Sequence, residues 1–97
     1  VLQRCFVRPP GVRAPDGWRG IVFSLSATGI GVTLPLAVER GTNMEIEAWN
    51  LPGAPILRAR VVHIAKLQFV WLTGGELSRR LDPDELSAWL TTVTAGT

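Results

Sequence analysis

In the stretch Thr28-Gly29-Ile30-Gly31-Val32-Thr33-Leu34, residues that are small or polar alternate with apolar residues from Gly29 onward. Its isoleucine, valine and leucine fall on one face and its glycines and second threonine on the other, which is the pattern of a half-buried β-strand. Pro35 follows at once and has no N–H group to continue a sheet, so it ends the strand. The segment predicts a domain built mainly from β-strands.

Similar short segments lie on both sides of this stretch. The alternation predicts further strands over residues 18–24, 42–49, 56–64 and 67–72, with a turn at 50–53. Within residues 56–64, the pattern places one set of side chains on a common face: Leu57, Ala59, Val61 and His63. Short strands at this regular spacing indicate a small barrel.

The carboxyl-terminal part of the chain changes to helical periodicity. Asp82 is a good N-cap, Pro83 suits the first helical position, and Glu85 stands three residues after the cap. An apolar stripe with i, i+3, i+4, i+7 spacing follows, formed by Leu86, Trp89, Leu90 and Val93. We therefore predict one helix that covers the barrel.

Length and composition predict one small domain. The chain has 97 residues, of which 46% are hydrophobic, and its apolar runs are too short to span a bilayer or to form a signal peptide. Residues 1–17 contain three prolines and two glycines, which predicts an irregular arm before a barrel domain over residues 18–97. The single cysteine agrees with a reducing cytoplasm. The first residue is Val1 rather than methionine, as expected for a piece of a longer protein.

Residues that commonly carry catalysis are scarce. His63 is the single histidine, and no second His or Cys stands at metal-ligand spacing, so we interpret it as a half-buried structural residue. Cys5 has no neighbouring base in the sequence. The carboxylates in residues 82–85 are explained by helix capping. We expect a binding protein rather than an enzyme, with no catalytic residue and no metal site.

Two short motifs combine with the predicted strands and helix into the pattern of a known family. Arg4 and Arg8 are spaced Arg-x-x-x-Arg, and residues 24–29 read Ser-x-Ser-x-x-Gly where the family carries Asp or Asn at the first position. Together with residues 58–64 and 82–86, the order of these segments resembles a PilZ domain over nearly the whole chain. The resemblance implies an all-β fold, a six-stranded antiparallel barrel closed by a carboxyl-terminal helix.

The resemblance also implies that the domain binds cyclic di-GMP, a bacterial second messenger with two guanines and two phosphates. The site residues it implies are Arg4, Arg8, Ser24, Ser26 and Gly29, with the arginine arm closing over ligand held on the barrel. A guanidinium can contact the O6 and N7 acceptors of guanine or a phosphate, and can stack on a base. A glycine lets the backbone approach a ligand closely.

Two alternatives remain open. Ser24 in place of Asp or Asn favours a degenerate PilZ-like module that binds proteins and not the nucleotide. The arginine excess, nine of the ten basic residues at a net charge of +2, admits a small-barrel nucleic-acid binder. The preferred expectation is a cytoplasmic receptor for cyclic di-GMP that acts on a downstream protein or neighbouring domain, without membrane insertion or a polynucleotide partner.

Overall fold

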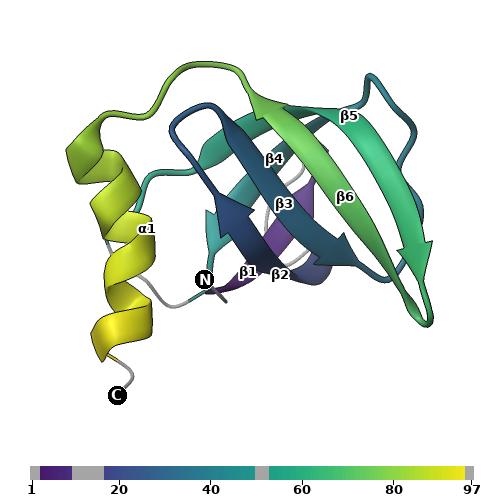
Figure 1. The fold of residues 1–97 in the computed structure, drawn as a ribbon, viewed down its shortest axis with the longest axis horizontal. Helices are drawn as coiled ribbons and strands as arrows, with labels where there is room; N and C mark the ends of the chain where they lie inside the picture. Colours follow the sequence, from purple (N-terminus) through teal and green to yellow (C-terminus); the bar gives the residue numbers. More distant parts are fainter. Residues whose placement is uncertain (1–2, 10–16, 50–52, 96–97) are drawn as a thin grey trace.

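The computed structural model is a closed antiparallel β-barrel with one helix beside it (Figure 1). It describes residues 3–9, 17–49 and 53–95, with side chains up to Leu90. The elements are β1 (Gln3–Arg8), β2 (Trp18–Leu25), β3 (Gly29–Leu34), β4 (Asn43–Ala48), β5 (Leu57–Leu67), β6 (Val70–Leu77) and α1 (Pro83–Ala95). The strands are ordered β1-β2-β3-β6-β5-β4, and β4 pairs back with β1. The predicted fold class is confirmed.

The barrel interior is filled by the apolar side chains that alternate along each strand. On β3 the three predicted inward residues are all buried, and Met44 and Ile46 on β4 are buried as predicted. Glu45 and Glu47 alternate with them on the outer face, where they are partly exposed. The two-residue alternation of a strand therefore accounts for the core over β3 and β4.

Residues 3–8 form a strand, so the prediction of an irregular arm over residues 1–17 is wrong for this part. Cys5 and Val7 point into the core and are 1% and 0% exposed. β1 pairs with β2 on one side and with β4 on the other. This double pairing closes the barrel and leaves neither neighbour with a free edge. The other residues of the predicted arm, 1–2 and 10–16, lie outside the described residues.

The β5–β6 hairpin is longer than the sequence pattern indicated. β5 continues to Leu67, and β6 begins at Val70, which pairs with Leu67 across a turn of two residues. The pairing register shifts between Val61 and His63, and this bulge turns His63 to the outer surface, where it is exposed. The interpretation of His63 as half-buried is therefore wrong, because a bulge changes which face the following side chains occupy.

Helix α1 begins with the predicted capping box. The Asp82 carboxylate accepts a hydrogen bond from the Glu85 N–H at 2.8 Å, and the Glu85 carboxylate accepts one from the Asp82 N–H at 3.1 Å. Arg79 also donates to Glu85, which lowers the pKa of Glu85 to about 2. In the apolar stripe of α1, Trp89 is buried, and the side chain of Val93 lies outside the described part. Most of the turn predicted at residues 50–53 also lies outside the described residues.

Candidate ligand-binding groove

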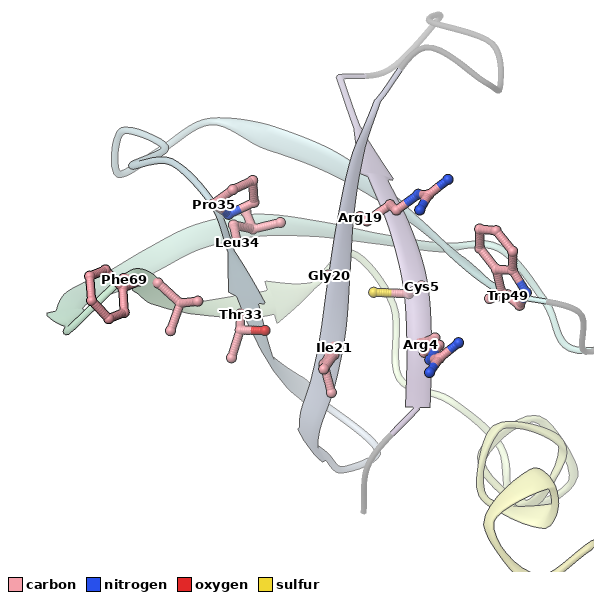
Figure 2. Close-up of a pocket in the computed structure, with 11 residues that line it drawn as sticks. Arg4, Cys5, Arg19, Gly20, Ile21, Thr33, Leu34, Pro35, Trp49 and Phe69 are labelled. Atoms are coloured by element: carbon pink, nitrogen blue, oxygen red, sulfur yellow. The ribbon is translucent and has the colours of Figure 1, made fainter. Parts of the chain in front are cut away.

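A groove of about 540 Å³ runs over the outer surface of β1, β2 and β3 and is bounded by Trp49 and the β5–β6 hairpin (Figure 2). We call it the β1–β3 groove. Arg4 and Arg19 bring two positive charges to its lining, which contains no carboxylate among the described residues. The remaining lining is apolar, aromatic or small. The groove therefore suits an anionic ligand that also carries rings or apolar groups.

Strand pairing places the two arginines on the same side of the sheet. Arg4 on β1 lies opposite Ile21, and Phe6 lies opposite Arg19 on β2. Arg4 and Arg19 are thus diagonal neighbours, a relation that sets residues about 7–8 Å apart. Arg4 is exposed and makes no ion pair within the described part of the chain. Its guanidinium is available to a ligand.

Arg19 makes a cation–π contact with Trp49, whose ring in turn lies against Phe6. Its guanidinium carbon lies 5.4 Å from the centroid of the Trp49 ring, and the Trp49 ring lies 4.7 Å from the Phe6 ring. The backbone N–H of Trp49 donates to the carbonyl oxygen of Arg4 at 2.8 Å, which anchors Trp49 beside β1. A cation–π contact restricts the rotamers of Arg19 before any ligand arrives. Ligand binding then loses less side-chain entropy than it would with a free arginine.

Arg8 takes a structural position instead of a solvated one. It is only 5% exposed, and its Nη2 atom lies 2.9 Å from a carboxylate oxygen of Glu47. Its Nε atom lies 3.9 Å from Glu45, which also binds Arg58. The expectation that Arg8 belongs to an irregular arm is therefore wrong, because it ends strand β1 and its side chain is buried. The side chain ties the end of β1 to β4.

Ser24, Ser26 and Gly29 lie together around the β2–β3 turn. The Ser26 hydroxyl oxygen accepts hydrogen bonds from the N–H groups of Thr28 and Gly29 at 3.4 and 3.1 Å, so it is engaged in the turn itself. Ser24 is exposed beside a bulge in β2. A Cβ atom added to Gly29 would make ordinary contacts, the nearest at 3.5 Å, so the fold alone does not require glycine there.

The structure does not bring Arg8 to this turn. Val7, next to Arg8, pairs with Trp18 at the start of β2, whereas the turn follows the other end of that strand. Ser26 is eight positions beyond Trp18, a distance of about 26 Å at about 3.3 Å per residue. Arg4, opposite Ile21, lies between the two ends. The five predicted residues therefore lie in three separate places. Arg4 lines the groove, Arg8 is in a buried ion pair, and the other three lie at the β2–β3 turn: Ser24, Ser26 and Gly29.

Two residues of the groove were not found from the sequence. In the barrel, β1 is the only strand between β2 and β4. Arg19 on β2 and Trp49, which follows β4, are therefore close neighbours across β1, although they lie 30 positions apart in the chain. The alternation along β2 does indicate that Arg19 faces outward. The position of Trp49 beside Arg19 depends on the β1–β4 pairing. The sequence did not predict that pairing, because residues 1–17 were expected to form an irregular arm.

Other reactive groups have structural explanations. Burial raises the pKa of the Cys5 thiol to about 12, so it stays protonated and is a poor nucleophile near neutral pH. Among the described residues, no group of three or more His, Cys, Asp or Glu side chains could hold a metal ion. No helix in that part of the chain has the length and apolar character needed to cross a membrane.

Replacing Arg8 with alanine should destabilise the fold. We expect the free energy of unfolding to fall by about 1–2 kcal/mol, between the values for exposed and for buried ion pairs, because Arg8 is buried and Glu47 is partly exposed. Urea unfolding followed by tryptophan fluorescence measures this change. Arg4→Ala on the same strand is the matched control and should shift stability by about 0.5 kcal/mol or less. Equal stabilities for the two variants would contradict a structural role for Arg8.

Comparison with known proteins found no family model, no curated protein and no solved structure that matches the chain. The fold defines a small closed β-barrel domain with a terminal helix. The resemblance to PilZ domains remains a prediction from short motifs. A functional proposal therefore depends on the groove and its chemistry.

Proposed function

We propose that this domain is a receptor for cyclic di-GMP, which binds in the β1–β3 groove through Arg4 and Arg19. The observation that carries the proposal is the combination of an unpaired arginine and a second arginine held on an aromatic ring, in a groove whose described lining has no carboxylate. The role is that of a regulatory module in bacterial signalling and not of a catalyst. The bound domain would then act on a downstream protein or a neighbouring domain in the cytoplasm.

The groove chemistry fits the parts of this ligand. The Arg19 guanidinium, whose carbon lies 5.4 Å from the centroid of the Trp49 ring, can either stack on a guanine base or donate from its edge to the O6 and N7 acceptors of a guanine. Arg4, without a carboxylate partner, can donate to a phosphate. The volume of about 540 Å³ lies within the usual range of small-ligand sites.

The proposal changes the residues that the sequence pattern suggested. Arg19 takes the role expected of Arg8, because Arg8 is buried against Glu45 and Glu47. Ser24 and Gly29 lie on the Arg4 side of the sheet and remain predicted contacts for a ligand that extends toward the β2–β3 turn. Ser26 has the separate task of holding that turn.

Calorimetric titration with cyclic di-GMP tests the proposal, with GTP and cyclic di-AMP as comparison ligands. We expect binding of cyclic di-GMP, and we expect Arg4→Ala and Arg19→Ala each to weaken it about 10- to 100-fold, the effect of losing a hydrogen bond to a charged group. Arg60→Ala is the matched control, since Arg60 is an exposed strand arginine on β5 outside the groove lining. Absence of binding by the folded wild-type protein, or equal affinities for all three ligands, would refute the proposal.

A second candidate is a domain that no longer binds the nucleotide and instead binds a protein. Two observations favour it: Arg8 is committed to an ion pair, and Ser24 stands where the family carries Asp or Asn. The same titration decides between the two, because this candidate expects no heat of binding from any of the three nucleotides.

A further inference from the structure

Phe69 is the most exposed large hydrophobic residue of the described chain. It lies in the two-residue turn of the β5–β6 hairpin and is 93% exposed. The preceding residue, Gln68, has a positive φ of 53°, a left-handed conformation that closes the turn tightly. Phe69 has no ring contact within the described residues. Its ring therefore stands at the hairpin tip, almost fully exposed and without an aromatic partner among the described residues.

This ring borders the β1–β3 groove at the end opposite the arginines. Figure 2 shows Phe69 on one side and Arg4, Arg19 and Trp49 on the other, with Ile21 and Thr33 between them. Going from Arg19 on β2 to the hairpin crosses two strand spacings, since the order is β2-β3-β6. Two spacings of about 4.8 Å amount to about 10 Å along the sheet. One base cannot cover both ends of the groove.

We propose that Phe69 is a second ring-binding surface and determines specificity, so that the groove selects a ligand with two ring systems over one with a single ring. This inference rests on the proposed function. Arg19 on Trp49 holds the first ring, and Phe69 stacks on the second. Ile21 and Thr33, cross-strand partners on β2 and β3, form the floor between the two rings.

The expected effect follows from the strength of base stacking on an aromatic side chain. Removal of such a side chain weakens binding by about 5- to 150-fold per stacked base. A ligand with one guanine has its best site at the arginine end, where charge and stacking act together. Its affinity should therefore not depend on Phe69.

The test compares cyclic di-GMP with GMP on wild-type protein and on Phe69→Ala. Amide chemical shifts in ¹⁵N spectra follow both titrations and report affinities as weak as millimolar. Leu67→Ala is the matched control, because Leu67 is an exposed apolar residue of the same hairpin, 53% exposed, that does not line the groove. We expect Phe69→Ala to lose at least fivefold in affinity for cyclic di-GMP and less than twofold for GMP, with Leu67→Ala unchanged for both.

The outcomes separate this inference from the proposed function. If wild type binds cyclic di-GMP but Phe69→Ala binds it equally well, or loses affinity for GMP to the same extent, the second ring site is refuted and the receptor proposal stands. If wild type binds neither nucleotide, both proposals fail together.

Discussion

Replacement of Trp89 by alanine is expected to lower the free energy of unfolding by about 3–5 kcal/mol, the usual cost of removing a large buried aromatic side chain. Trp89 is 1% exposed and belongs to the hydrophobic core together with Leu77 and Leu81. Its indole N–H donates to the carbonyl oxygen of Pro55 at 2.9 Å. The indole therefore connects α1 to the chain that precedes β5 through both packing and a hydrogen bond.

Thermal unfolding measures this effect directly. In a domain of this size each kcal/mol corresponds to about 4–8 °C, so the melting temperature should fall by at least about 12 °C. Trp89→Phe is the matched control: it keeps a ring in the core but leaves the Pro55 carbonyl without its donor, so its loss should be clearly smaller. A melting temperature for Trp89→Ala within a few degrees of wild type would mean that α1 is not part of the cooperative fold.

Local sequence patterns were sufficient for much of the fold. The alternation in β3 and β4 predicted their inward residues, and Asp82, Pro83 and Glu85 predicted the start of α1. These features depend on neighbours within a few positions in the chain. Periodicity and capping rules describe such neighbours well.

Long-range pairing could not be predicted in the same way. Residues 3–8 alternate as a strand, but the prolines after them suggested an irregular arm, and only pairing with both β2 and β4 shows why they extend. The bulge after Val61 reversed the predicted side of His63. A bulge depends on the register of two strands, so a pattern within one strand does not reveal it.

The candidate site illustrates the same limit. Arg4 was identified from its motif and does lie in the groove, while Arg8 from the same motif is buried in an ion pair. Both side chains point to the outer face of β1, as a spacing of four residues requires in a strand. Their different roles come from what the neighbouring strands place beside them: Trp49 and Arg19 near the first, Glu45 and Glu47 near the second.

Strands β2 and β3 approach each other closely at Gly20. A Cβ atom added to Gly20 would lie 2.5 Å from the backbone carbonyl oxygen of Thr33 and 3.1 Å from a methyl group of Val32. A backbone oxygen in a paired strand cannot rotate away as a flexible side chain can. Gly20→Ala should therefore lower the free energy of unfolding by about 2–3 kcal/mol, the upper part of the range for overpacking.

Urea unfolding of Gly20→Ala tests this, with Gly29→Ala as the matched control. The added Cβ at Gly29 meets nothing closer than 3.5 Å, so its stability should stay within about 0.5 kcal/mol of wild type. Gly20 also stands between Arg19 and Ile21 in the lining of the groove, so a displaced β2 would move both side chains. Gly20→Ala should then weaken cyclic di-GMP binding as well as lower stability. If the variant unfolds at the same urea concentration as wild type, β2 and β3 can move apart at this position without loss of stability.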